Sequence, residues 1–404
     1  MTQAFLASAR RRYIDSNAAT LRWMLARGRL QGAYLNTKMN PLTLVDYAAA
    51  DGWRGPDHIY GWIQGRGLES AATHAEAFAA IGPDITSGLD AAGRRLYDAL
   101  DRLLQRDGHV SFCYDAQMRP ARFLDSTQHV PQQQDADIYT FSDTFAAKGL
   151  VAAAARYAPA DLPRQLEALQ RVIDAIEDNR FQIDEKLPIT AANRAAQADD
   201  FGSRMIMLSA GALLTRIGRR DLTGFADRFI SHVIDRHFDP QSGLLRNVAG
   251  LDNCNVGHGI EFVGFALDYY LGTAIDPELL RVLETILVSS FEKGFQGPGV
   301  RLVVSASTGT PISPYCPWWT LPETMRSAAL CLERTGSPDV LRIWQTADAA
   351  FFERYWRPGS AVAYQCLTDD GPIDYVPATP DLDPGYHTGL SLLAAIEMVE
   401  RLGA

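Results

Sequence analysis

The chain has 404 residues, of which 38 are Lys or Arg and 48 are Asp or Glu, so its formal net charge is −10. A length of this order suits one large domain or two medium ones. The excess of acidic residues argues against nucleic acid or an anionic membrane surface as the main partner, because both attract a basic protein face. A neutral or cationic small molecule is the expected ligand.

The apolar stretches are short, and the cysteines are scattered. The longest apolar runs, such as residues 390–396, fall well below the roughly 20 residues that a membrane helix needs. The N-terminal segment lacks the apolar core and the cleavage site of a signal peptide. The five cysteines are odd in number and include no CxxC pair, which predicts neither a disulfide framework nor a zinc cluster. We therefore expect a cytoplasmic protein.

Apolar residues recur with helical spacing along the whole chain. This pattern predicts twelve helices, near residues 3–27, 62–80, 88–106, 141–157, 162–178, 203–217, 221–237, 258–271, 276–293, 319–335, 339–355 and 387–402. Alternating patterns are confined to residues 109–114, 243–248 and 361–367, which predict short β-ribbons. Because no segment rich in Pro, Gly or Ser separates these elements, residues 1–404 are expected to form a single domain.

Six pairs of helices predict an all-α fold, an (α/α)6 barrel with the short β-ribbons in its connecting loops. In such a barrel each helical hairpin buries its apolar face against its neighbours, and the connections at one end form a concave site. Periodicity by itself leaves an open solenoid as the alternative.

The sequence lacks the motifs of nicotinamide, P-loop, zincin and nucleophile-elbow chemistry. What remains are clusters of polar and aromatic residues at helical spacing. In the first, Glu261 follows His258 by three residues, so both side chains project to one side of a helix start. An imidazole beside a carboxylate is suited to moving a proton near neutral pH. The alternative is a capping or structural histidine.

Two further clusters pair an indole with a charged residue four positions later. Trp319 with Glu323 offers a stacking surface and a hydrogen-bond acceptor, which match the C–H face and the hydroxyls of a sugar ring. Trp62 is followed by Arg66, whose guanidinium could bind a sugar oxygen or stabilise negative charge on it. Taken singly, the tryptophans before Glu323 are also consistent with core packing, and Arg66 is also consistent with a surface or salt-bridged arginine.

Together these clusters resemble the N-acylglucosamine 2-epimerase family, which includes cellobiose 2-epimerases and mannose isomerases. Five segments carry the resemblance: Ile59–Leu68 (IYGWIQGRGL), Tyr139–Leu150 (YTFSDTFAAKGL), Asn255–Phe265 (NVGHGIEFVGF), Trp318–Glu323 (WWTLPE) and Tyr386-His387. They are similar to the family's W-x-Q-x-R, F-S-[ED]-x-F, N-P-G-H-x-x-E, W-W-x-x-x-E and terminal [FY]-H motifs. The resemblance implies an (α/α)6 barrel, and by analogy a homodimer.

The activity implied by the resemblance is epimerisation or aldose–ketose isomerisation of a free reducing sugar, without cofactor or metal. A base removes the C2 proton of the open-chain sugar to give an enediolate, and a proton returns to the opposite face of C2 or to C1. The family's two acid/base histidines correspond to His258 and His387.

The resemblance also assigns the remaining site residues. Arg66 would contact the sugar oxygens and steady the enediolate, and Glu261 would orient His258 or assist ring opening. The candidate substrate-binding residues are Trp62, Trp319, Glu323, Arg246 and Tyr386. Arg246 is proposed only as a second basic contact upstream of His258.

Two positions depart from the family pattern. Ile206 stands where cellobiose epimerases and isomerases carry a further histidine, and Leu390 replaces an arginine that follows the terminal histidine. The N-acylglucosamine epimerases are apolar at the first position, which favours an N-acyl sugar. Two other functions stay open: a glycoside hydrolase or lyase that uses Glu261 and Glu323, and a relative that binds a sugar without catalysis.

Overall fold

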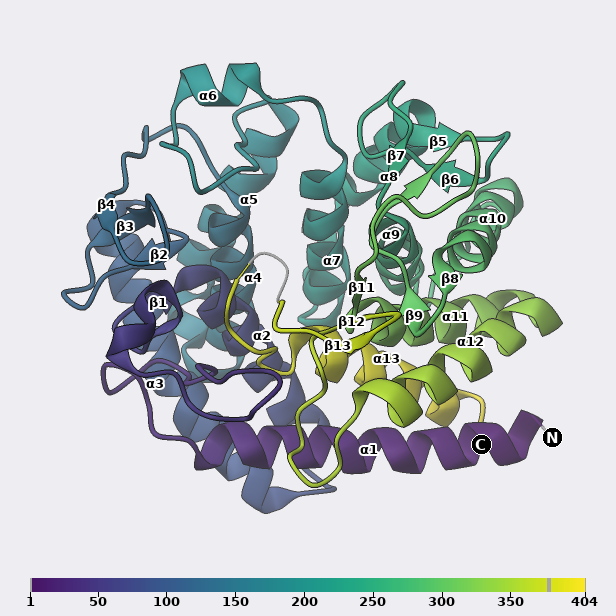
Figure 1. Ribbon diagram of the computed structural model, residues 1–404, viewed down its shortest axis with the longest axis horizontal. Coiled ribbons are helices and arrows are strands. Elements are labelled where there is room, and N and C mark those ends of the chain that lie inside the picture. The colour runs from purple at the N-terminus through teal and green to yellow at the C-terminus, as the bar shows by residue number, and fades with distance from the viewer. Residues whose placement is uncertain (1, 376–378, 404) are drawn as a thin grey trace. The chain divides into compact units, whose positions relative to one another are not determined.

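The computed structural model describes residues 2–375 and 379–403, and most of them lie in helices (Figure 1). The helices are α1 (Thr2–Ala26), α2 (Gly61–Ala77), α3 (Pro83–Asp107), α4 (Phe141–Tyr157), α5 (Leu162–Glu177), α6 (Ala191–Ala196), α7 (Gly202–Arg216), α8 (Gly224–His237), α9 (Val256–Tyr269), α10 (Pro277–Gly294), α11 (Thr320–Thr335), α12 (Pro338–Ala350) and α13 (Ser391–Arg401). Each predicted helix is confirmed to within a few residues, and the short α6 is an addition to the prediction.

Two of these helices carry a wider, π-helical turn. The turn Phe351–Tyr355 continues α12, and the turn Tyr386–Leu390 leads into α13. Within the described part of the chain, no helix is both long and apolar enough to cross a bilayer.

The strands are short antiparallel ribbons in the connections between helices. The sequence predicted three of them, and the structure confirms these as β2 (Cys113–Tyr114) with β3 (Pro120–Phe123), β5 (Phe238–Asp239) with β6 (Leu244–Leu245), and β12 (Cys366–Thr368) with β13 (Gly371–Pro372). The remaining strands are β1 (Ile59–Tyr60), β4 (His129–Pro131), β7 (Asn253–Cys254), β8 (Phe295–Gln296), β9 (Gly299–Val300), β10 (Val304–Ser305) and β11 (Cys316–Pro317). Most of these hold two residues, too few for alternation to be recognised.

Residue contacts divide the described chain into two compact units. Of the described residues, the first comprises 2–19, 199–375 and 387–403, and the second comprises 20–198 and 379–386. The chain thus leaves the first unit and returns to it twice, so neither unit is one continuous stretch of sequence. The single-domain organisation stays a prediction.

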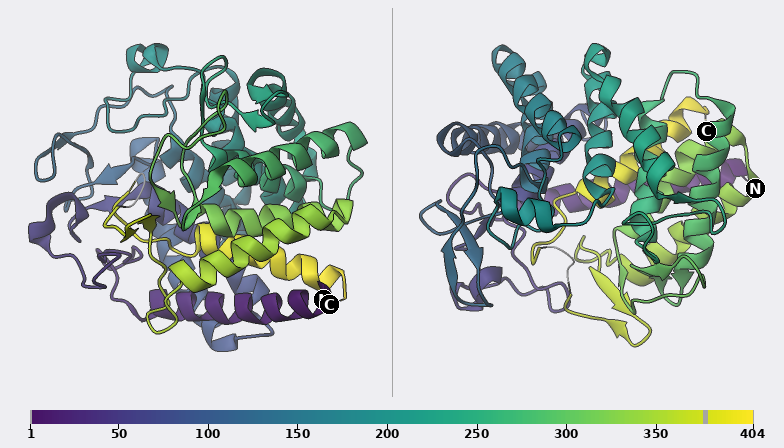
Figure 2. Two further views of the ribbon diagram at one scale, coloured as in Figure 1. Left: turned by 45° about the vertical axis from the view of Figure 1, so that its right-hand side comes forward. Right: turned by 90° about the horizontal axis from the view of Figure 1, so that it is seen from above.

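In the first unit, the helices pack as hairpins. Helices α7, α9, α11 and α13 pack on one another in that order, while α8, α10 and α12 each pack on the helix before them (Figures 1 and 2). The burial pattern explains this arrangement. Every residue from Thr320 to Cys331 of α11 is buried, whereas α8 buries a single stripe that runs from Phe225 to His237. A helix buried all round lies inside, and a helix with one apolar stripe covers it.

The second unit follows the same rule, with α3 packed on α2 and α5 on α4. Helices α2 and α4 approach closely because glycines face each other at their contact. A Cβ added to Gly65 would lie 2.6 Å from the backbone nitrogen of Ala146, and one added to Gly149 would meet the Gly65 carbonyl. This approach brings the Phe145 ring to 5.2 Å from the Trp62 ring.

The glycine contact gives a first prediction. Gly65→Ala should lower the free energy of unfolding by about 1–3 kcal/mol, because the added methyl group forces two backbones apart. Urea denaturation followed by circular dichroism measures the change. Gly224→Ala, in α8, is the matched control, since its Cβ would meet its nearest atom at 3.8 Å. The control should change stability by less than about 1 kcal/mol. Equal effects of the two substitutions would contradict the prediction.

Candidate active site

Two histidine rings of the first unit lie against the indole of Trp319, immediately before α11. The ring centroids of His258 and His387 are each 5.6 Å from that of Trp319, with the ring planes tilted by 34° and 33° respectively. Trp319 and His387 are buried, and His258 is partly exposed. The structure therefore brings together three residues that the sequence places on three separate helices.

The start of α9 explains how His258 reaches the indole. Asn255 caps this helix, and its side-chain oxygen accepts a hydrogen bond of 3.2 Å from the backbone N–H of His258. One residue before His258, a Cβ on Gly257 would lie 2.5 Å from the Trp319 ring. Only a glycine lets the indole approach the first turn of α9 so closely.

Two buried carboxylates meet at one nitrogen of His387. The distance from His387 Nδ1 to Glu323 Oε1 is 3.0 Å, and the distance to Glu261 Oε1 is 3.5 Å. Because an ionised carboxylate can only accept a hydrogen bond, Nδ1 carries the proton and donates it to Glu323. Nε2 is then the basic nitrogen of the neutral ring. Glu261 therefore has a close contact with His387, and the role that the resemblance implies for it, orienting His258 or assisting ring opening, stays a prediction.

Arg326 completes this cluster from the next turn of α11. Its Nη1 lies 3.1 Å from Glu323 Oε2. Burial by itself raises the pKa of Glu323, but Arg326 and the hydrogen bond from His387 outweigh that effect and hold the pKa below its usual value. Glu323 is therefore ionised at neutral pH and stabilises the imidazolium that forms when His387 takes a proton. The sequence reasoning missed Arg326, for which the three-residue spacing from Glu323 was the available signal.

The second unit holds an aromatic and cationic cluster. The guanidinium carbon of Arg66 lies 5.1 Å from the ring centroid of Trp62, 4.1 Å from that of Phe145 and 5.3 Å from that of Tyr386. Contacts of this kind between a guanidinium and aromatic faces fix the orientation of its plane. The structure therefore brings together three predicted site residues, Trp62, Arg66 and Tyr386, within this unit.

A buried ion pair supports Tyr386. Lys148 donates a hydrogen bond of 2.6 Å to the Tyr386 hydroxyl, and its Nζ lies 3.1 Å from Glu69 Oε2. Burial lowers the pKa of Lys148, but Glu69 and the tyrosine reverse that effect and raise it. Lys148 is therefore charged, although its side chain is fully buried. Lys148 lies in the segment Tyr139–Leu150, but no sequence pattern pairs it with Glu69, because the two residues lie on different helices.

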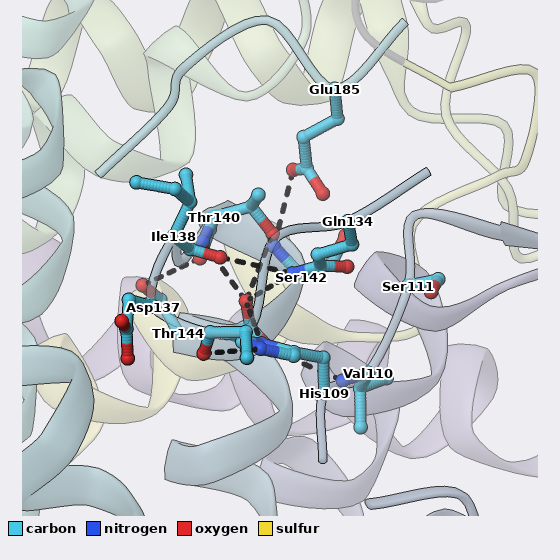
Figure 3. Close-up of polar contacts among 12 residues, drawn as sticks. His109, Val110, Ser111, Gln134, Asp137, Ile138, Thr140, Ser142, Thr144 and Glu185 are labelled. Carbon is cyan, nitrogen blue, oxygen red and sulfur yellow. Dashed lines mark hydrogen bonds and ion pairs between the residues drawn. The ribbon is translucent and has the colours of Figure 1, made fainter. Parts of the chain in front are cut away.

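The acidic residue of the FSDTF segment caps a helix. Asp143 and Thr140 form a capping box at the start of α4, in which the Thr140 N–H donates a 3.0 Å hydrogen bond to Asp143. His109 lies beside them, with its Nδ1 3.2 Å from Asp143 Oδ1. The same helix start donates a 3.1 Å hydrogen bond from the Ser142 N–H to Glu185 (Figure 3). Burial raises the pKa of Glu185 to about 8.

Arg246 is paired within the first unit. Its guanidinium lies 3.0 Å from Asp239 and donates a 2.8 Å hydrogen bond to the Leu251 carbonyl. No hydrogen bond or ion pair among the described residues joins Arg246 to Trp319, His258 or His387, so its role in binding substrate stays a prediction.

The donor atoms of Glu261, Glu323 and His387 lie within 4.8 Å of one another, a geometry that could hold a metal ion. In this chain Arg326 and the N–H of His387 already provide Glu323 with positive charge and a hydrogen bond. The group therefore suits proton transfer at His387 better than it suits metal binding.

No family model matches the chain, and no curated protein matches its sequence. Sugar epimerases share its fold. The cellobiose 2-epimerase from Bacillus thermoamylovorans B4167 matches with a TM-score of 0.74 at 15% identity, over 98% of this chain and 99% of that chain. A D-mannose isomerase matches with a TM-score of 0.70 at 12% identity, over 98% and 97% of the two chains. A family 76 glycoside hydrolase from a bovine Bacteroides thetaiotaomicron strain matches with a TM-score of 0.55 at 13% identity, over 96% and 78%.

These neighbours are (α/α)6-barrel enzymes. They confirm the predicted all-α fold of this class, and they agree with the resemblance to the N-acylglucosamine 2-epimerase family that the five motifs indicate. At these identities the likeness establishes the fold, and the reaction has to be argued from the side chains.

The lowered pKa of Glu323 predicts how stability depends on pH. The pKa of a glutamate in the unfolded chain is near 4.5, above that of folded Glu323. Ionisation of Glu323 therefore contributes stability that is fully present above this value and is lost as pH falls through the lower, folded-state pKa. Glu323→Gln should lower stability at neutral pH and should then lose less stability than the wild type between about pH 5 and about pH 3.

Urea unfolding at each pH measures this difference. Glu353→Gln, which removes an exposed glutamate of the same unit, should retain the wild-type pH dependence. Parallel acid profiles for the wild type and Glu323→Gln would show that Glu323 makes no such contribution.

Proposed function

We propose that the protein is a cofactor-independent epimerase or aldose–ketose isomerase that acts at C2, or at C1 and C2, of a free reducing sugar or N-acyl sugar. The observation that carries this proposal is the pair of imidazoles, His258 and His387, each 5.6 Å from the Trp319 indole. Removing a proton from one carbon and returning it to another face or atom requires acid/base groups close to one site. The indole offers an apolar surface for the C–H face of the sugar.

The chemistry follows from the open-chain form of the sugar. The aldehyde acidifies the C2 proton, and Nε2 of one histidine accepts it. The C–H electron pair becomes the C1=C2 double bond, and the former carbonyl oxygen takes the negative charge of an enediolate. A proton delivered to the opposite face of C2 gives the epimer as the aldehyde re-forms. A proton delivered to C1, with transfer of the C2 hydroxyl proton to the C1 oxygen, gives the ketose. His387 is suited to the role of base because Glu323 stabilises its imidazolium form.

The residues of the second unit keep the roles that the family resemblance implies. Arg66 would stabilise the enediolate oxygens, and the rings of Trp62 and Tyr386 hold its guanidinium in one orientation. Ile206, buried in α7, is apolar as in the N-acylglucosamine epimerases. This position supports an N-acyl sugar as the first substrate to test.

Hydrogen exchange tests the reaction directly. Incubation with a panel of free aldoses, N-acyl aminosugars and disaccharides in heavy water should introduce deuterium at C2 of one of them, or at C1 for an isomerase, as detected by NMR. His387→Asn keeps an N–H that can donate to Glu323 but lacks the basic nitrogen. It should slow exchange by at least about 10²-fold.

The matched control is His129→Gln, which removes an exposed histidine of the second unit. This variant should exchange at the wild-type rate. The proposal is overturned if the wild type exchanges no sugar of the panel, or if His387→Asn exchanges as fast as the wild type.

A glycoside hydrolase is the second candidate. The donor atoms of Glu261 and Glu323 lie within 4.8 Å of each other, close to the separation of about 5–5.5 Å in retaining glycosidases. Against this function, both carboxylates are buried against His387, and Arg326 pairs with Glu323. Release of new reducing ends from an oligosaccharide, without deuterium at C2, would select the hydrolase. Sugar binding with neither reaction would select a non-catalytic relative.

A further inference from the structure

A second group of ionisable side chains lies in the first unit, and the proposed reaction gives it no role. Asp199 lies just before α7, and His232 and His237 lie on α8. One donor atom of each residue lies within 4.8 Å of the other two. Nε2 of His232 is 3.9 Å from Oδ2 of Asp199, and the two imidazole centroids are 6.0 Å apart.

The surroundings of His237 define which of its nitrogens is basic. Its Nδ1 lies 3.0 Å from the backbone oxygen of Arg246. A carbonyl oxygen can only accept, so Nδ1 carries the proton and Nε2 carries the lone pair of the neutral ring. His237 is 1% exposed, and its Nε2 is buried with no hydrogen-bond partner among the described residues. A hydrogen bond from the far nitrogen to a carbonyl is also how metal-binding histidines are held in place.

His232 lies nearer the surface than His237. Its Nε2 is also buried and makes no hydrogen bond to any residue within 2–375 or 379–403. Burial lowers the pKa of both imidazoles, that of His232 to about 4, so both rings are neutral near pH 7. The side chains of Asp199 and His232 are 44% and 24% exposed, which gives an ion a path from solvent.

We propose that Asp199, His232 and His237 bind one divalent transition-metal ion of the Zn²⁺ class. Two imidazoles and one carboxylate, with a remaining position for water, are a ligand set that zinc uses in proteins. With metal–ligand bonds of about 2.0–2.2 Å, the three donors would have to close to roughly 3.0–3.5 Å from one another. Rotation of the two partly exposed side chains supplies this movement, while His237 stays fixed by its bond to the Arg246 carbonyl.

Two charges modify the affinity in opposite directions. The C-terminal end of α8, where His237 lies, carries the negative end of the helix dipole and favours a cation. Arg204 lies on the other side of Asp199, with its Nη1 3.6 Å from Oδ1. Because Arg204 pairs with Oδ1, Oδ2 of Asp199 still faces His232. The positive charge of Arg204 repels the metal ion and weakens its binding. We therefore expect weaker binding than in a closed zinc site with four protein ligands.

The bound ion would join the segment before α7 to the end of α8. That segment includes Phe201, directly before α7, whose ring centroid is 5.5 Å from that of His237 and 6.4 Å from that of His258. Metal binding would therefore hold in place a ring that packs on a proposed acid/base residue. The site itself is independent of the proposed reaction, and its test does not depend on activity.

Metal titration of the full chain tests the site. After treatment with a chelator and dialysis, isothermal titration calorimetry with Zn²⁺ should give one ion per chain, and Zn²⁺ should raise the melting temperature. Titration with Co²⁺ should produce the visible d–d absorption of imidazole-bound cobalt. His237→Asn keeps an N–H for the Arg246 carbonyl and removes the ligand nitrogen, and His232→Gln makes a milder change on a partly exposed side chain. Each should weaken Zn²⁺ binding by at least about tenfold and abolish the cobalt band.

Two controls separate this site from others in the chain. His129→Gln removes an exposed histidine, and His387→Asn disrupts the other cluster whose donors could hold a metal. Both should bind Zn²⁺ as the wild type does. The proposal is overturned if the wild type binds no ion, if His232→Gln and His237→Asn bind as tightly as the wild type, or if either control loses the ion.

Discussion

The buried carboxylate of Glu323 is the constraint on which the candidate site depends. Its side chain is inaccessible to solvent, so its charge is tolerated only where other charged groups compensate for lost hydration. Arg326, on the same helix, places its Nη1 3.1 Å from Glu323 Oε2. His387, in the turn that leads into α13, places its Nδ1 3.0 Å from Glu323 Oε1. The packing of α11 on α13 therefore has to place His387 at this distance, and the same contact sets the ring against Trp319.

In the second unit, the buried charge of Lys148 is likewise compensated by nearby polar groups. Lys148 is fully buried in α4, and it is held by Glu69 of α2 and the hydroxyl of Tyr386. The close approach of α2 and α4 at Gly65 and Gly149 makes this pairing possible, because helices separated by larger side chains would leave the ammonium group without its partner. In both units, the helices that are buried on all sides carry the charged groups. Each such group has few orientations available, because partners at short distance hold it in place.

Helix positions and individual motifs could be predicted from the sequence, and the pairing of side chains could not. Periodicity located the helix that contains Glu323 and the one that contains His258, because apolar spacing depends only on neighbours along the chain. The link between Glu261 and His387 depends on the packing of two helices that lie far apart in sequence. Asp143 is a second example of what the sequence left open. It lies in the motif segment Tyr139–Leu150, and the structure shows that its side chain caps a helix.

What the sequence determined by itself is the all-α fold with its hairpin pattern, and the presence of side chains whose chemistry allows proton transfer. These follow from local periodicity and from the chemistry of single side chains. Only the tertiary structure decided that Arg326 lowers the pKa of Glu323, that Trp319 is shared by two imidazoles, and that Asp199 meets His232 and His237. Electrostatic and coordination effects decay over a few ångströms, so they depend on distances between atoms in the folded chain. The order of residues along the chain does not specify those distances.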